Sequence, residues 1–536
     1  MLSSSRFAET SPASSRQPAP LTEVLREIKK SYWLRFRNGQ PEFEEAGTNG
    51  RFDASAVDGM VTACPLDRLG DATFRQRHGL RYAYVAGAMA NGIGSVEIVE
   101  AMGRAGMLGF FGAAGLSPDA VDAAIHSLQS RLGREDSQPM GFNLIHSPNE
   151  PELENAIVDL YLRRHVRLVE ASAFLDLTLP IVRYRVHGIS REPSGRMVVP
   201  NRIIAKVSRV EVATKFMSPP PQALLQELVR RGEISPQQAE WAGQIPMADD
   251  VTAEADSAGH TDNRPAIALL PTIIALRDRL QERFCYPEPV GVGLAGGIST
   301  PASAAAAFAM GAAYVVTGSV NQACVESGSS DLVRQMLAEA EQADCIMAPA
   351  ADMFEMGVKL QVLKRGTMFA MRAQKLYELY RKYDALEEIP AAERASLEKT
   401  VFRLPLDEVW HQTCDFFRQR DPKQIERARR DAKHKMALVF RWYLGQSSRW
   451  ANSGESSRRI DFQIWCGPAM GAFNEWVKGS FLEQPANRQV VTVALNILYG
   501  ASVLLRANQL RCQGVPVAGN FLKIVPQSKA DLEQYL

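Results

Sequence analysis

The stretch GLAGGISTPASAAAAFAMGAAYVVTGS, residues 293–319, repeats one pattern twice: an apolar run, a glycine turn and the start of a helix. The first run ends at Gly296–Gly297 and the second ends at Gly318–Ser319. Thr300 is a typical N-cap for the intervening helix, and Pro301 suits its first position. The helix is rich in alanine and can therefore approach a sheet closely. A buried strand followed by a covering helix is typical of a parallel α/β sheet.

The same alternation of apolar runs and helical patterns extends over residues 80–330. Continuous apolar strands separated by helices indicate parallel pairing with both faces covered. Eight such units predict an α/β fold with a (β/α)8 TIM barrel. A doubly wound open sheet is the alternative, because strand order cannot be read from sequence. The predicted strands span 81–87, 107–112, 140–145, 166–172, 202–208, 249–255, 289–295 and 312–318.

Two segments interrupt this repeat. Residues 181–199 are predicted to form an added hairpin that turns at Pro193–Gly195. Residues 218–246 begin with prolines and continue with a helical pattern. A long insertion after a barrel strand lies on the active face, so the second segment is predicted to be a helical lid.

The chain divides into four predicted parts. Residues 1–20 are rich in Ser, Pro and Ala and are predicted to be a disordered tail, with a transit peptide as the runner-up. Residues 21–79 form an N-terminal extension, and 80–345 form the barrel. Residues 346–536 show helical spacing and few strand signals, which predicts a mainly α-helical region for substrate or partner.

The bulk composition excludes several classes of protein. A length of 536 residues exceeds what one core usually supports, so more than one domain is expected. The net charge of +1 gives no global attraction to nucleic acid or to a membrane. Seven scattered cysteines without metal-ligand spacing favour a reducing cytoplasm over a disulfide framework or a metal site. No apolar run is expected to reach the ~18 residues that span a bilayer.

The two glycine turns of the opening stretch are a candidate phosphate site. In a barrel they are the seventh and eighth strand–helix loops, where backbone N–H groups can hold a phosphate. Glycine lets the oxyanion approach the backbone closely. The plainer interpretation is that each glycine only makes a tight turn, but two adjacent loops favour phosphate. Gly92–Ile93–Gly94 is a weak dinucleotide fingerprint, because its third glycine is missing.

Polar side chains interrupt three of the predicted strands near their ends. Asn143, Glu170 and Lys206 each need a partner, a water or a ligand if they are buried. A Glu170–Lys206 ion pair without any ligand is the plain alternative. A polar ring at the barrel mouth is the functional interpretation, which three such strands favour.

The stretch VTAEADSAGHTDNRP, residues 251–265, brings a histidine to the same mouth. Glu254 ends the predicted strand, and His260 lies in the loop that follows. An imidazole can donate a proton near neutral pH, and a nearby acid can orient it. A single histidine is more often a cap or a surface residue; the shared mouth makes His260 a candidate catalyst.

Several long stretches resemble one known family. AGAMANGIGSVEIVEAMGRAGMLGFFGAAGL, EADSAGHTDNRP, GLAGGISTPASAAAAFAMGAAYVVTGSVNQA and DFQIWCGPAMGAFNEWVKGS are similar to the PfaD family, the trans-acting enoyl reductase of polyunsaturated fatty acid and trans-acyltransferase polyketide synthases. The resemblance covers most of the chain from about residue 30 to 515. The barrel is similar, more distantly, to nitronate monooxygenases and flavin-dependent enoyl-carrier-protein reductases. The resemblance implies FMN as cofactor, NADPH or NADH as reductant, and acyl carrier protein domains as partners.

The resemblance also implies roles for individual residues. In the reaction that the resemblance implies, the reduced flavin passes a hydride to the β-carbon of an enoyl thioester. His260 then protonates the α-carbon, and Lys206 or a backbone N–H stabilises the enolate. Glu170 and Glu254 complete the predicted cofactor-binding set. One departure is Ala258–Gly259, where the wider superfamily often has two glycines before the histidine. The residues matched to the flavin site are Ala88, Met89 and Ala90 beside the ring, Asn143 near the ring and ribityl chain, Lys206 at the flavin, and Gly296, Gly297, Gly318 and Ser319 around the phosphate.

Three rival functions stay open at this point. A nitronate oxidase would consume oxygen with alkyl nitronates. A non-catalytic scaffold would dock carrier proteins through the helical region and hold no flavin. A phosphate-binding lyase on the same barrel is the third. The sequence does not choose between polyketide and fatty acid pathways, nor an oligomeric state, for which a homodimer is one option.

Overall fold

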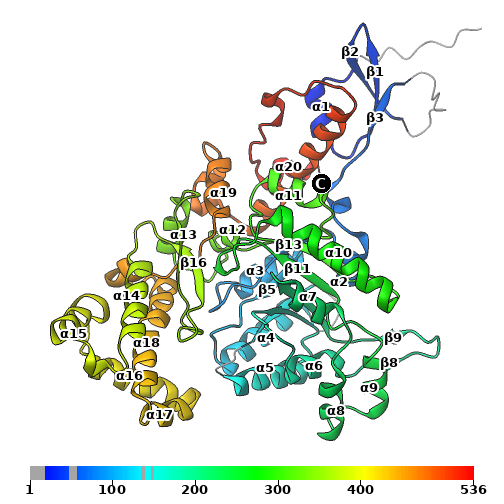
Figure 1. Ribbon diagram of the computed structural model, residues 1–536. Coiled ribbons are helices and arrows are strands. Elements are labelled where there is room, and N and C mark those ends of the chain that lie inside the picture. Colours follow the sequence, from blue (N-terminus) through cyan, green and yellow to red (C-terminus); the bar gives the residue numbers. More distant parts are fainter. Residues whose placement is uncertain (1–17, 48–56, 134–138, 147–149, 536) are drawn as a thin grey trace, which may run out of the picture.

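The computed structural model describes residues 18–47, 57–133, 139–146 and 150–535, so most of the predicted tail lies outside the described residues. At its centre is a closed barrel of eight parallel strands in the order β10-β11-β13-β14-β4-β5-β6-β7 (Figure 1). The last barrel strand pairs with the first, Val315 with Tyr84, so the open doubly wound sheet is excluded and the TIM barrel is confirmed. The strands are β4 Tyr84–Ala86, β5 Leu108–Phe111, β6 Gly141–Ile145, β7 Leu168–Ser172, β10 Arg202–Val207, β11 Asp250–Glu254, β13 Gly291–Ala295 and β14 Val315–Thr317.

Helices cover the barrel because each strand leads into a capped, amphipathic segment. Ser95 accepts a hydrogen bond from the Ile98 N–H, and Thr300 accepts one from the Ser303 N–H. Thr300 is therefore the predicted N-cap, with Pro301 as the first helical residue. The covering helices are α3 Val96–Arg104, α4 Pro118–Leu132, α5 Pro151–Arg163, α6 Leu179–Val186, α7 Val210–Met217, α10 Ala266–Phe284 and α11 Pro301–Ala309, with the short α12 Ser319–Gln322 after β14.

The insertion at 181–199 is shorter than predicted. Its first part belongs to α6, whose side chains from Ile181 onward are mostly buried. The hairpin proper consists of β8 (Ser190–Arg191) and β9 (Met197–Val198), which pair antiparallel. Buried apolar residues at helical spacing therefore override the strand-like composition of the first part.

Residues 218–246 contain α8 (Gln222–Arg230) and α9 (Pro236–Ala242), which contact α6. This insertion follows helix α7 and precedes strand β11, so it leaves the barrel at the N-terminal end of the strands. None of its residues lines the cavity described below. Its expected position over the active face is therefore corrected.

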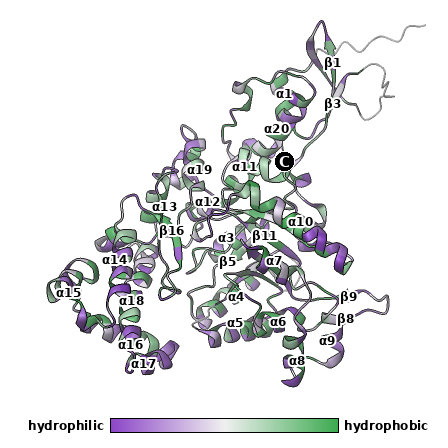
Figure 2. Ribbon diagram, viewed as in Figure 1, coloured by the Kyte–Doolittle hydropathy of each residue, from purple (hydrophilic) through white to green (hydrophobic). Residues whose placement is uncertain are grey.

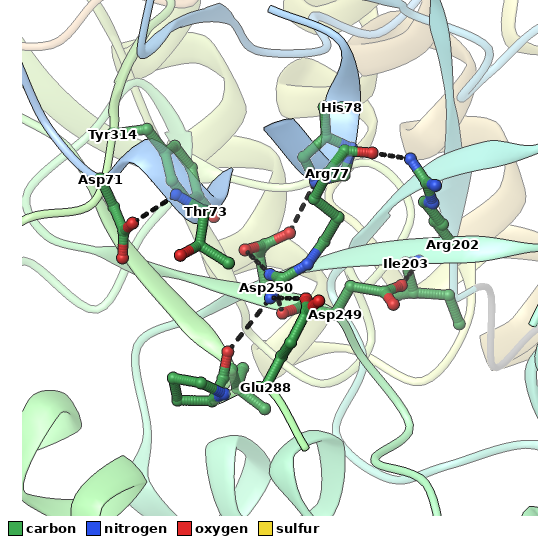
Figure 3. Close-up of polar contacts among 12 residues, drawn as sticks. Asp71, Thr73, Arg77, His78, Arg202, Ile203, Asp249, Asp250, Glu288 and Tyr314 are labelled. Atoms are coloured by element: carbon green, nitrogen blue, oxygen red, sulfur yellow. Dashed lines mark hydrogen bonds and ion pairs between the residues drawn. The ribbon is translucent and has the colours of Figure 1, made fainter. Parts of the chain in front are cut away.

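An ionic network closes the N-terminal end of the barrel (Figure 3). The Asp250 carboxylate accepts a hydrogen bond from Arg77 at 2.7 Å and lies 2.6 Å from His78 Nε2. Arg77 also reaches the Glu288 carboxylate at 3.1 Å. The Arg77 and His78 side chains both come from α2 (Ala72–His78), so this helix is tied to the first residue of β11. The network stabilises the end opposite to the expected active site.

Beyond the barrel lies a three-stranded antiparallel sheet that the sequence did not predict. It has the order β12-β16-β15, with β12 Gly259–His260, β15 Cys345–Pro349 and β16 Lys359–Leu363. The short strand β12 comes from the loop after barrel strand β11. The sheet therefore connects the barrel mouth to the C-terminal region, which contains more than helices.

The C-terminal helices group beside the barrel and share a hydrophobic core of their own (Figure 1). The strands of the barrel are largely hydrophobic in Figure 2, whereas α17 at the far tip of the group is hydrophilic. The predicted helical character of the region is confirmed. The helices are α14 Phe369–Lys382, α15 Ala391–Leu397, α16 Leu406–Arg420, α17 Pro422–Ala428 and α18 Ala432–Ser453, with α13 Asp331–Ala338 and α19 Ala469–Val477 between the group and the barrel.

The first described helix and the last long helix meet on the other side of the barrel. Helix α20 (Val490–Cys512) packs against α11 and against α1 (Leu21–Arg26) (Figure 1). Its buried Arg506 donates hydrogen bonds to backbone carbonyls of the N-terminal extension. Besides α1 and α2, the extension contains a three-stranded sheet of β1 Tyr32–Arg37, β2 Gln40–Glu45 and β3 Gly59–Val61. The proposed domain boundaries stay a prediction.

Among the described residues, α20 is the one helix that is long and apolar enough to cross a membrane by length and composition. This corrects the expectation that no such run exists. In the fold, 83% of its most apolar window is buried inside the protein. That burial is typical of a core helix.

Candidate active site

A cavity of about 560 Å³ lies at the C-terminal end of the barrel strands, between the barrel mouth and helices α16 and α18. This size is ordinary for a small-molecule site. The structure brings almost all predicted site residues to this one space, and their roles stay predictions. The predicted residues that line the cavity are Ala88, Met89, Ala90, Asn143, Lys206, Glu254, His260, Gly296, Gly297, Gly318 and Ser319.

Glu170 is the exception, because it lies buried below the cavity. One carboxylate oxygen accepts a hydrogen bond from the Ala88 N–H at 2.8 Å, and the other has no hydrogen-bond partner among the described residues. Burial raises the pKa of Glu170, although the Lys206 charge partly opposes this. A buried acceptor without a partner is costly unless a ligand satisfies it.

Lys206 pairs with Glu254 rather than directly with Glu170. Its Nζ lies 3.0 Å from a Glu254 carboxylate oxygen. Burial by itself would lower the pKa of Lys206, but the Glu254 and Glu170 charges outweigh it and raise that pKa. Lys206 is therefore a fixed positive charge at the mouth. The alternative prediction of an isolated Glu170–Lys206 ion pair is therefore corrected. Lys206 contacts Glu254 directly, and Glu170 acts on it from a greater distance.

The period of two along a strand explains why these side chains converge. Lys206 is in register with Thr252 on β11, and Asn143 is in register with Glu170 on β7. Residues at the same level of neighbouring strands point to the same side, here into the barrel. Asn143 is 5% exposed, and its amide donates to the Glu170 carbonyl oxygen at 3.1 Å. This bond fixes the amide at the mouth.

His260 faces an acid that lies far away in the sequence. Its Nε2 is 3.1 Å from the Asp352 Oδ1, and its side chain is 34% exposed. Burial opposes protonation of the ring, but the Asp352 carboxylate outweighs burial and raises the pKa of His260. The Asp352 contact therefore favours the imidazolium over the neutral ring, and the imidazolium is the form that can donate a proton.

The small sheet positions His260. Strand β12 pairs with β16, with Gly259 opposite Gln361. The Gln361 amide donates to the Asp256 carboxylate at 2.9 Å and to the Ser257 carbonyl at 2.8 Å. The sequence predicted His260 but missed both its orienting acid and this sheet.

The two glycine loops open onto the cavity. A Cβ added at Gly297 or Gly318 would meet no atom within 4 Å. A Cβ at Gly296 would lie 2.6 Å from the backbone of Ala255, and its φ is +84°. Gly296 therefore makes the turn, while Gly297 and Gly318 leave room for a ligand. The hydroxyl of Ser319 accepts a hydrogen bond from the Gly467 N–H at 3.2 Å.

The loop after β4 presents only small side chains and Met89 to the cavity. A Cβ at Gly112 would lie 1.7 Å from the Met89 carbonyl oxygen, and one at Gly94 would lie 3.1 Å from the Met89 N. The loop therefore rests on glycine backbone, while Ala88, Met89 and Ala90 line the cavity. This arrangement suits a flat ring on the cavity side.

The outer wall of the cavity comes from residues that the sequence did not single out. Helix α16 supplies Phe416 and Arg420, and α18 supplies Arg441 and Arg449. Trp465 also lines it, so the stretch 461–476 contributes to the wall as well as to packing. No local motif marks these residues, because they reach the cavity only through long-range packing.

Comparison with known proteins gives the family. Residues 383–462 match the family model described as acyl-carrier-protein S-malonyltransferase, inserted helical domain. The chain is 50% identical over 465 residues to a polyunsaturated fatty acid synthase component of Thraustochytrium, covering 85% of this chain and 31% of that protein. It is 46% identical over 449 residues to the polyketide biosynthesis protein PksE of Bacillus subtilis, covering 84% of this chain and 58% of that protein. The chain thus spans less than two thirds of these curated relatives.

A solved structure matches over its full length. The enoyl reductase domain of MlnA, from the macrolactin biosynthesis cluster of Bacillus amyloliquefaciens, is 40% identical, with a TM-score of 0.79. The match covers 84% of this chain and 100% of that domain. The chain therefore belongs to the family of barrel proteins that includes the enoyl reductase domain of MlnA.

Proposed function

We propose that this protein is a trans-acting enoyl reductase of the PfaD type. Its substrates are α,β-unsaturated acyl thioesters on acyl carrier protein domains of a polyketide or polyunsaturated fatty acid synthase, in the cytoplasm. The observation that carries the proposal is one cavity in which the His260–Asp352 pair, the Lys206–Glu254 pair and two open glycine turns face the same space. The relatives named for polyketide and polyunsaturated fatty acid synthesis support the substrate class.

FMN is the proposed cofactor, with NADPH or NADH as the reductant. The residues present fit it: Gly297 and Gly318 leave room for a phosphate, and the backbone at Ala88–Ala90 leaves room for a ring. When bound, FMN supplies the hydride chemistry that reduction of a carbon–carbon double bond requires.

His260 provides the proton for the α-carbon of the substrate. Asp352 occupies Nε2, so Nδ1 is the ring nitrogen that hands over the proton. The Asp352 carboxylate raises the pKa of His260 and so favours the ring form that carries this proton. Asp352 then stabilises the ring in one orientation, which general acid catalysis needs.

Lys206 stabilises negative charge that develops on the thioester oxygen. It stays protonated because Glu254 and Glu170 offset the effect of burial on its pKa. A positive charge held in a partly buried site stabilises an enolate more than a solvated charge does, since no solvent has to reorganise. Glu254 keeps the ammonium in place through the 3.0 Å contact.

The test is the visible absorbance spectrum of the purified protein before and after anaerobic NADPH, and then after an enoyl thioester on a carrier protein. The proposal expects a flavin band that bleaches with the reductant and returns with the thioester. Fast oxygen consumption with an alkyl nitronate, together with indifference to the thioester, would instead indicate an oxidase. If the protein is colourless and takes up no added FMN, the remaining candidates are the non-catalytic scaffold and the phosphate-binding lyase.

A further inference from the structure

The outer end of the cavity holds two arginines around one aromatic ring. The guanidinium carbon of Arg420 lies 5.5 Å from the centroid of the Phe416 ring, and that of Arg449 lies 5.3 Å from it. All three residues line the cavity, on helices α16 and α18. The pair is therefore part of the substrate cavity, at the end formed by the helical region.

Most basic side chains that line the cavity lie next to a carboxylate. At the barrel mouth, Lys206 faces Glu254 and His260 faces Asp352. Arg441 contacts Glu355 at 3.3 Å, and Arg420 is held by Glu150. Arg449 has no carboxylate partner among the residues that the structure describes. It contributes the unmatched positive charge of the outer wall.

The charge of Arg420 is already matched by Glu150. Its Nε and Nη2 donate to the two oxygens of Glu150 at 2.7 and 2.8 Å, so one edge of its guanidinium is engaged. Desolvation and the nearby Arg420 charge both lower the pKa of Arg449. An anion bound next to Arg449 would relieve both unfavourable effects. The Arg449 guanidinium stays protonated despite its lowered pKa, because arginine is a very strong base.

We propose that Arg449 binds the phosphate of the pantetheine arm that carries the acyl thioester. This inference rests on the proposed function. The arm is linear, with the thioester at one end and a single phosphate near the other. His260 and Arg449 line the same cavity, so a thioester at His260 leaves the phosphate of the arm further along that cavity. Helix α18 passes the His260–Asp352 pair at Arg441, whose charge acts on Asp352. Arg449 lies two turns further along this helix, about 12 Å away.

Guanidinium suits this ligand because its planar fork donates two parallel hydrogen bonds to phosphate oxygens. The glycine turns at Gly297 and Gly318 form a different anion site, which the proposed cofactor occupies. The nicotinamide donor also carries phosphates, so phosphate is the shared chemistry of two sources. The experiment therefore measures each source separately.

The test compares Arg449→Gln with a matched Arg430→Gln control, since Arg430 is exposed and does not line the cavity. For an enoyl phosphopantetheine thioester, R449Q is expected to lower kcat/KM about tenfold or more, the usual effect of losing a hydrogen bond to a charged group. For the same thioester on pantetheine without phosphate, the change is expected to stay within about twofold. An equal fall on both substrates, or a rise in the KM of the nicotinamide donor alone, would overturn the assignment.

A binding measurement separates this inference from the proposed function. Calorimetric titration of the holoprotein with phosphopantetheine and with pantetheine needs no turnover. The expected result is tighter binding of the phosphorylated compound, lost in R449Q and kept in R430Q. If the protein reduces no enoyl thioester yet shows this binding pattern, the proposed reductase function is wrong and the phosphate site at Arg449 is supported. If it reduces the thioester while R449Q binds both compounds as the wild type does, the site fails and the function stands.

Discussion

The Nε2 atom of His260 lies 3.1 Å from the Oδ1 atom of Asp352, although 92 residues separate them in the sequence. His260 follows a barrel strand, and Asp352 lies in the connection between β15 and β16. The pairing of β12 with β16 brings them together. An acid on the small sheet beyond the barrel thus sets the protonation of a residue in the barrel mouth.

Asp352→Asn is expected to move the basic limb of the rate profile to lower pH. Asp352 raises the pKa of His260, so its removal lets the imidazolium lose its proton at lower pH. Enoyl reduction measured between pH 6 and 9 checks this. The control is Asp415→Asn, because the Asp415 side chain is 49% exposed and does not line the cavity. His260→Ala is expected to lower the rate on the order of 100-fold or more, as loss of a general acid does.

The same variant is also expected to change how stability depends on pH. The folded-state pKa of His260 lies above its unfolded value, so this contribution to stability is complete below the unfolded pKa and is lost as pH rises through the folded pKa. D352N should therefore lose more stability, relative to wild type, at pH 6 than at pH 9. An equal loss at both pH values would mean that the contact does not favour the protonated ring.

The barrel could be predicted from sequence, because mainly apolar runs alternate with helical patterns eight times along the chain. The glycine turns, Lys206 and His260 followed from their places at strand ends. Strands β15 and β16 were missed because they lie outside the strand–helix alternation of the barrel, in a segment with mostly helical spacing. Arg449 was missed because helical periodicity shows which face is apolar but not what that face meets.

Asp250→Asn is expected to destabilise the fold without changing the cavity. The substitution removes a buried charge that faces both Arg77 and His78, and breaking such a network usually costs about 3–5 kcal/mol. Urea unfolding at neutral pH measures this loss. The control is Glu288→Gln, because the Glu288 side chain is 64% exposed and its loss should be small. A changed KM for the thioester in D250N would contradict the structural role of this end of the barrel.

Lys206→Met is expected to make stability fall with rising pH. Without the ammonium, the partly buried Glu254 and the buried Glu170 face each other as uncompensated carboxylates. Burial already raises the pKa of Glu170, and losing the Lys206 charge raises it further. A carboxyl group with a raised folded-state pKa loses stability as pH rises past its unfolded pKa. The deficit against wild type should thus be larger at pH 8, on the order of 3 kcal/mol, than at pH 5.

Lys206→Arg is the matched control, because it keeps the positive charge. It should recover most of the stability at pH 8, whereas the enoyl reduction rate recovers only in part, since the bulkier guanidinium changes the contact with Glu254. A deficit of K206M that is the same at pH 5 and pH 8 would show that the three charges are not coupled.

The glycine turns allow binding and folding to be separated. Gly318→Ala places a methyl group in open space at a negative φ, so the fold should tolerate it. Gly296→Ala forces a Cβ to within 2.6 Å of the Ala255 backbone at a φ of +84°, so it should destabilise the protein by more than about 1 kcal/mol. If the turns hold the cofactor phosphate, G318A loses bound flavin while its melting temperature without added flavin stays near that of the wild type.

Flavin content per chain, from the visible absorbance, and the melting temperature of the flavin-free protein are the two measurements. Gly519→Ala is the control, since a Cβ there also meets no atom within 4 Å but Gly519 does not line the cavity. It should change neither quantity. Full flavin content in G318A would mean that the methyl group meets no ligand, and the phosphate would then have to lie away from this turn. Loss of flavin in both G318A and G519A would point to a general effect on the fold, so only the contrast between the two alanines assigns the turn to the cofactor.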